Sequence, residues 1–198
     1  MIRSSFDTRR AFAALTLVLG LFVSVPAGFA ASGTADARAV KLDQLFETLS
    51  HATSAEEGEA TTSAIWETWL EYGDPRIDAY MRNVVVAMNR QRFEIALEML
   101  DKIVEEVPDH SEAWNKRATV NYMVQRFDQS LEDIEKTLAL EPRHFGALSG
   151  KALILTARGE KEAALEAIEQ ALKIHPFLKG ARAIIERNGG TYRPQRGI

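Results

Sequence analysis

The chain of 198 residues contains no cysteine. Disulfides, thiolate metal sites and a cysteine nucleophile are therefore excluded. Positive charge is not in excess either, because 28 acidic residues outnumber 24 lysines and arginines. Nucleic acid is not an expected partner of such a chain, since binding to a phosphate backbone requires a basic surface. With 46% apolar and 26% charged residues, the composition is that of a folded globular protein.

The first thirty residues differ in composition from the rest. Three arginines precede an uncharged run that starts at Ala11 and extends past Pro26. A positively charged N-terminal region, an apolar middle and small residues at the cleavage site are typical of a secretory signal peptide. The sequence thus predicts a signal peptide over 1–30, of the Sec or twin-arginine type, and a periplasmic protein. An uncleaved N-terminal membrane anchor is the alternative.

A 34-residue repeat occupies residues 77–178. Pro108, Pro142 and Pro176 are spaced 34 residues apart. Sequence windows built on this spacing align without a gap, and several columns of small, large apolar or aliphatic residues agree in all three. Within each window the apolar residues recur at intervals of three and four, as on one face of a helix. The aligned windows are 77–110, 111–144 and 145–178.

Each window is predicted to form two antiparallel helices. The breaks are expected near 91–93, 125–127 and 159–161, and the proline ends the second helix because it cannot continue the hydrogen-bond ladder. Asp109 and Glu112 have the spacing of a capping pair that would start the next helix. A column of small residues marks where the two helices of a pair approach most closely. These residues are Ala96, Ser130 and Ala164.

This pattern resembles the tetratricopeptide repeat family, whose 34-residue unit is a helical pair. The resemblance covers 77–178 and implies an all-α fold, a right-handed superhelical solenoid of stacked antiparallel helix pairs. It also implies a concave side that binds a peptide or a helix of a partner protein. The sequence departs from the family pattern at Asn83, Arg117 and Lys151, where leucine is usual.

One of these departures predicts a contact. Arg117 should lie near Asp133 on the other helix of its pair, with its aliphatic stem packed and its guanidinium paired. We interpret the two residues as a structural ion pair. An anion-binding site at Arg117 is the alternative.

Two segments are expected to cover the ends of the solenoid, since repeats bury their apolar faces only against neighbours. The segment 40–75 is predicted to be an N-terminal helical hairpin, either a degenerate repeat or a cap, with two tryptophans in its core. The segment 177–188 is predicted to be a short capping helix. The linker 31–39 and the tail 189–198 are expected to be flexible.

The repeat also keeps the histidines apart. His110 and His144 occupy equivalent places in adjacent repeats, roughly 8–10 Å or more apart, whereas metal ligands lie within about 2.1 Å of one ion. His51 and His175 lie elsewhere along the chain. The sequence also has no H-E-x-x-H pair, glycine-rich phosphate loop or G-x-S-x-G elbow. We therefore expect no metal, no cofactor and no enzymatic activity.

The remaining candidate site is the concave surface, lined in such solenoids by the first helix of each pair. Methionine and tyrosine offer adaptable apolar contact to a helix or an extended segment. We predict a non-enzymatic periplasmic adaptor or scaffold that binds a protein partner in this groove. The alternatives are a self-assembling structural solenoid of the cell envelope, and a groove covered by the N-terminal helices. The predicted lining is Met81, Val85, Met88, Asn89, Asn115, Thr119, Tyr122, Met123 and Leu153.

Overall fold

The structure is a computed structural model that describes residues 27–193. This part of the chain contains nine α-helices and no strand, which confirms the predicted all-α class. The first 26 residues of the predicted signal peptide lie outside it. The helices are α1 (Ala27–His51), α2 (Ala55–Leu70), α3 (Pro75–Asn89), α4 (Phe93–Glu106), α5 (Ser111–Met123), α6 (Phe127–Leu140), α7 (Phe145–Arg158), α8 (Lys161–Ile174) and α9 (Ala181–Arg187).

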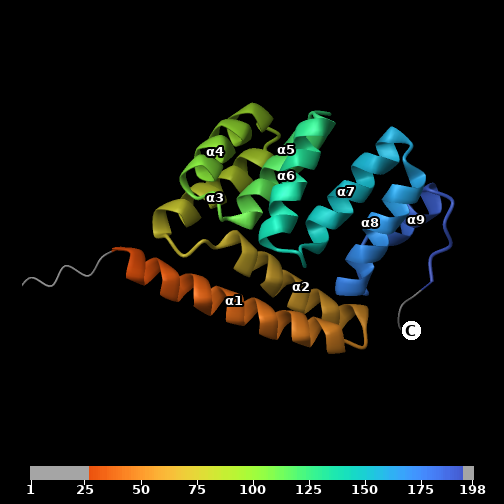
Figure 1. Cartoon of the computed structure of the whole chain (residues 1–198), viewed down its shortest axis with the longest axis horizontal. Coiled ribbons are helices and arrows are strands. Elements are labelled where there is room, and N and C mark those ends of the chain that lie inside the picture. The colour runs from red at the N-terminus through yellow and green to blue at the C-terminus, as the bar shows by residue number, and fades with distance from the viewer. Residues whose placement is uncertain (1–26, 194–198) are drawn as a thin grey trace, which may run out of the picture.

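Helices α3 to α8 form three helix pairs that stack side by side (Figure 1). The two helices of a pair contact each other, and the second helix of each pair also packs against the first helix of the next. Helix α9 closes the C-terminal end of the stack, where Ala181, Ile184 and Ile185 are buried against α7 and α8. The fold is therefore a solenoid of repeated helix pairs, as the sequence predicts.

Each pair turns through one residue with left-handed backbone. These residues are Gln91, Gln125 and Gly159, with φ values of 55°, 61° and 77°, and they occupy the same position of the repeat. A left-handed conformation costs a residue with a side chain roughly 1–2 kcal/mol, a cost that glycine avoids. The turns lie where the sequence predicts the breaks between helices.

The second helix of each pair ends two residues before the repeat's proline. Helices α4, α6 and α8 stop in this way ahead of Pro108, Pro142 and Pro176. The predicted column of small residues is buried between the helices of each pair. Its one polar member, Ser130, donates a hydrogen bond of 2.7 Å to the carbonyl oxygen of Ala118 on the other helix. Close approach of the backbones is thus the reason for the small side chains.

Helices α1 and α2 form a hairpin that does not continue the stack. The hairpin lies along the edge of the solenoid where the inter-repeat turns 107–110, 141–144 and 175–180 are found, here called the turn edge (Figure 1). Phe46 and Trp69 of the hairpin join one hydrophobic cluster with side chains of α7, α8 and α9. The hairpin therefore covers the repeats from the side, rather than the outer end of the first repeat.

The segment 31–39, expected to be a linker, belongs to a helix in the structure. Helix α1 begins at Ala27, so this segment is helical. Arg38 within it donates hydrogen bonds of 2.8 and 3.0 Å to the carbonyl oxygens of Glu71 and Tyr72, at the end of α2. These bonds fasten the N-terminal part of the hairpin to its own C-terminal end.

Two further expectations are corrected, one about the start of α5 and one about the C-terminal tail. Helix α5 begins at Ser111, and Asp109 accepts a hydrogen bond from the Tyr72 hydroxyl at 3.0 Å instead of capping the helix. In the tail, Tyr192 packs against the C-terminal cluster, so the described part of 189–198 is held in place.

None of the helices between residues 27 and 193 has the length and apolarity that crossing a bilayer requires.

Candidate partner-binding surface

Most of the residues predicted to line the groove, which lie on α3, α5 and α7, remain accessible in the structure. Met123 is 50% exposed and Asn89 is exposed. The other accessible residues are half-buried. They are Val85, Met88, Thr119, Tyr122 and Leu153.

Met81 and Asn115 do not line the groove, which corrects the prediction. Met81 is 0% exposed and belongs to the core of the first repeat, where Leu70 and Tyr72 of the hairpin side pack against it. Asn115 is buried and donates a hydrogen bond of 2.9 Å to Glu112. Both residues lie in the half of their helix nearest the turn edge. The accessible residues of the predicted lining lie in the later turns of α3, α5 and α7.

Three buried histidines join the turn edge to α2. His110 Nε2 donates to the carbonyl oxygen of Trp69 at 3.0 Å, and His175 Nε2 lies 2.8 Å from Thr62 Oγ1. His144 stacks on the ring of Trp69, with the ring centroids 3.9 Å apart. One imidazole from the end of each repeat therefore contacts the same helix of the hairpin.

The contact between the turn edge and α2 is here called the seam, and Glu112 is its buried acid. It accepts a hydrogen bond of 2.9 Å from His144 Nε2 and lies 2.6 Å from Lys116 Nζ. Because His144 Nδ1 accepts from the backbone N–H of Ala147, the imidazole proton is on Nε2. Burial raises the pKa of Glu112, but the charge of Lys116 and the hydrogen bond from His144 outweigh it and lower the pKa to about 2. The acid stays ionised and is fully committed to structural partners.

The seam is closed by aromatic side chains. The ring of Trp66 packs edge-on against those of His144 and Phe145, and Lys116 Nζ lies 5.2 Å from its centroid. A Cβ atom added to Gly146 would overlap the Trp66 ring. Glycine at this position is therefore the feature that lets α2 approach α7 so closely.

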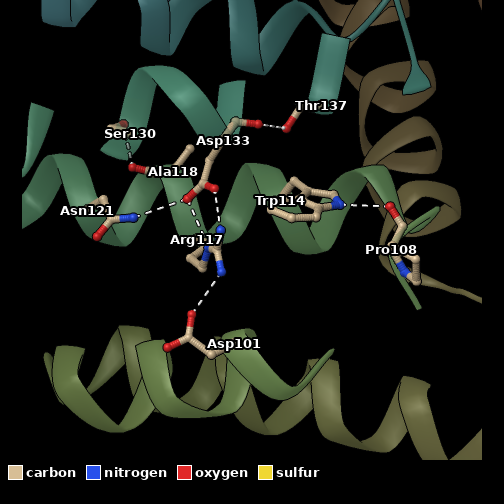
Figure 2. A network of polar contacts seen from close by, with 9 residues as sticks. All are labelled: Asp101, Pro108, Trp114, Arg117, Ala118, Asn121, Ser130, Asp133 and Thr137. Atoms are coloured by element: carbon tan, nitrogen blue, oxygen red, sulfur yellow. Dashed lines mark hydrogen bonds and ion pairs between the residues drawn. The ribbon is translucent and has the colours of Figure 1, made fainter. Parts of the chain in front are cut away.

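Arg117 forms the predicted ion pair with Asp133. Figure 2 shows its guanidinium between three helices: Nε and Nη2 donate to both carboxylate oxygens of Asp133 at 3.0 and 2.7 Å, and Nη1 donates to Asp101 at 2.9 Å. Asn121 donates to the same Asp133 carboxylate at 3.1 Å. Asp101 belongs to α4 of the preceding repeat, so Arg117 joins two repeats as well as two helices of one repeat. Its hydrogen-bonding groups are used within the protein, which favours a structural role.

No three histidine and carboxylate side chains in residues 27–193 come close enough together to hold a metal ion. Glu112 and His144 alone contribute two such groups, and both are already bonded. Sequence reasoning missed the role of this pair. Two features of the sequence pointed to this role. His110 and His144 occupy equivalent places in adjacent repeats. Gly146 stands where the other two windows carry acids, Asp78 and Glu112.

The repeats are also visible in comparisons with known proteins. A sequence model described as tetratricopeptide repeat matches residues 122–178. A TPR repeat-containing protein of Rhizobium etli is 38% identical over 84 residues, or 42% of this chain and 41% of the relative. Residues 122–178 of this chain are therefore tetratricopeptide repeat. The chain matches less than half the length of that relative.

Solved structures of other tetratricopeptide-repeat proteins show the same fold. The TPR2B domain of yeast Sti1, solved as a complex with pHsp70, has a TM-score of 0.52 at 17% identity, covering 57% of this chain and 92% of that domain. The Sgt2 TPR domain from Aspergillus fumigatus has a TM-score of 0.50 at 20% identity, covering 63% and 89%. At such identities the likeness concerns the fold.

Proposed function

We propose that this tetratricopeptide-repeat protein is a non-enzymatic adaptor that holds a segment of a partner protein against the concave face of α3, α5 and α7. The observation that carries the proposal is the row of accessible side chains that the hairpin leaves uncovered. The complex of the Sti1 domain with pHsp70 supports a binding role for such a stack.

The chemistry of this face favours an apolar segment. Met88, Tyr122 and Met123 provide flexible and aromatic apolar contact, and Asn89 provides an amide. The accessible part of the predicted lining contains no charged side chain. A helix or extended segment with apolar side chains at regular spacing would fit such a surface. An affinity in the micromolar range, about −8 kcal/mol, is expected of one groove of this size.

We test this role by photocrosslinking. A photoreactive amino acid at Met123 would face the groove, and the same group at Ile95, which is 47% exposed on α4, is the matched control. The expected result is one partner captured at Met123 and not at Ile95. With that partner purified, Met88→Ala and Tyr122→Ala should weaken binding without lowering helicity in circular dichroism. Unchanged binding by both variants would contradict the groove assignment.

We further propose that the protein is exported to the periplasm of a bacterium through the signal at residues 1–30. N-terminal sequencing of the protein isolated from the native envelope is expected to begin at Ala31. A mature protein that retains Met1, or one found with the cytoplasmic fraction, would contradict export and cleavage. This outcome would leave the groove proposal intact.

Self-assembly through the ends of the chain has little surface available. Trp69 is buried within the hairpin seam, and Ile184 and Ile185 of α9 are buried against the third repeat. The apolar side chains of these two segments are thus already used inside one chain. We therefore favour the adaptor role over a structural solenoid.

A further inference from the structure

The first repeat exposes a face that the other two repeats bury. Val86 is 45% exposed, whereas Val120 and Ile154, at the same position of the second and third repeats, are 0% exposed. Tyr80 is 37% exposed, whereas the equivalent Trp114 is half-buried and Leu148 is buried. The difference follows one side of α3. We call this side the stacking face, formed by Ala79, Tyr80, Asn83 and Val86.

The structure shows what covers this face in the other repeats. Val120 packs in a cluster with the helices of the first repeat, and Ile154 clusters with Ile134 of α6. In both cases the second helix of the preceding pair packs against the first helix of the next. Helix α3 stands at the end of the stack, and the hairpin lies on the turn edge (Figure 1). In the described part of the chain, no second helix takes that place on α3.

Two of the charged contacts across the repeat boundaries share one arrangement. Arg126 of the second repeat lies 3.4 Å from Glu94 of the first, and Arg158 of the third repeat pairs with Asp128 of the second. In each case the later repeat supplies the arginine. The earlier repeat supplies a carboxylate from the first turn of its second helix.

The first repeat carries the same arginines without their carboxylates. Arg92 is equivalent to Arg126, and Arg90 is equivalent to Arg158. Both are exposed, and neither forms an ion pair within residues 27–193. The stacking face and its two arginines thus reproduce the apolar and the charged parts of an internal repeat boundary, with the covering helix missing.

We infer that the stacking face of α3, with Arg90 and Arg92, is a docking surface for an amphipathic helix of another protein. That helix carries aliphatic side chains on one face and a carboxylate in its first turn. A second copy of this chain fits less well. The equivalent acid at the far end of the stack, Glu162, flanks a surface already covered by α9, and two stacking faces in contact would bring unpaired arginines together.

The test uses α6, the helix that covers the equivalent face of α7 inside the protein. The probe is a peptide of residues 125–142, spanning α6, with an amide bond between the exposed side chains of Glu132 and Lys136 to hold it helical. A fluorophore on the peptide reports binding to the full chain by anisotropy. Saturable binding is expected, weakened at least tenfold by Val86→Glu. Ile95→Glu, an equally exposed aliphatic position on α4, should leave the affinity unchanged.

A charge exchange tests the arginines separately. Arg90→Glu with Arg92→Glu should weaken binding of the peptide about tenfold, and the same variant should regain affinity for a peptide with Asp128→Arg. All substituted residues are exposed, so the variants are expected to fold.

Four results would overturn the inference. They are no binding of the peptide by the full chain, equal binding by Val86→Glu, a dimer in sedimentation velocity that Val86→Glu dissociates, and binding that appears only after removal of residues 1–30. The third result would assign the face to a second copy of the chain. The fourth would assign it to the chain's own N-terminal segment.

Discussion

Lowering the pH should weaken the contact between the hairpin and the turn edge and so destabilise the protein. The contribution of His175 to this effect is the easiest to measure. Its Nε2 lies 2.8 Å from Thr62 Oγ1, and the Thr62 hydroxyl already donates to the carbonyl oxygen of Gly58 at 2.6 Å. The hydroxyl therefore accepts from Nε2–H, and a second proton would have to sit on Nδ1. That atom is buried and has no hydrogen-bond partner, so the charged form is strongly disfavoured.

The magnitude follows from the pKa. Burial lowers the pKa of His175 from 6.5 to about 4. As the pH falls, the unfolded chain takes up the proton first, so the stability that His175 contributes is complete above about pH 6.5 and is lost toward pH 4. At pH 4.5 the loss amounts to about 2–3 kcal/mol of unfolding free energy. Burial also lowers the pKa of His110, which acts in the same direction.

The assay is urea unfolding of the wild-type chain and His175→Gln at several pH values between 7 and 4.5. The variant should show a smaller loss of unfolding free energy over this range, by about 2 kcal/mol or more. His51→Gln removes an exposed histidine from the end of α1 and is the matched control. If His175→Gln loses as much stability on acidification as the wild type, the reasoning from the buried Nδ1 is wrong.

Three further predictions test the fold. Gln91→Gly and Gln125→Gly should each raise the unfolding free energy by about 1 kcal/mol in urea titrations, because the left-handed turn then costs nothing sterically; destabilisation by both would refute this. Arg117→Ala should lower it by about 3 kcal/mol, since two carboxylates lose their shared partner, whereas Arg182→Ala, at an exposed pair, should change little. Gly146→Ala should displace a tryptophan ring of α2 and shift tryptophan emission to the red; an unchanged spectrum would contradict the close approach.

The repeat region could be predicted from the sequence because its signals are local. Proline at a fixed interval and apolar spacing along each window define helix ends and faces without knowledge of the fold. The pairing of Arg117 with Asp133 was also predictable, since the two helices of one repeat pack in a fixed register. The left-handed glutamines at 91 and 125 gave a weaker signal, because only the third repeat has glycine at that position.

The candidate groove was predicted in part. Residues in the later turns of the first helices, such as Met88 and Met123, are accessible, while Met81 is buried. A periodic pattern assigns all of them to one face of the helix, because it contains no information about what lies against that face. Met81 packs instead into the core of the first repeat, together with side chains of α4 and α5 that the pattern of one helix does not include.

The sequence by itself determined the helix pairs, their repeat and their internal packing, since each of these depends on residues a few positions apart or on one constant interval. The tertiary structure alone decided where the hairpin sits, which buried acid and imidazoles meet across its seam, and which end of the stack stays open. Those features depend on single contacts such as Gly146 with Trp66 and His175 with Thr62. Such pairs lie 80 to 113 residues apart and leave no periodic trace in the sequence.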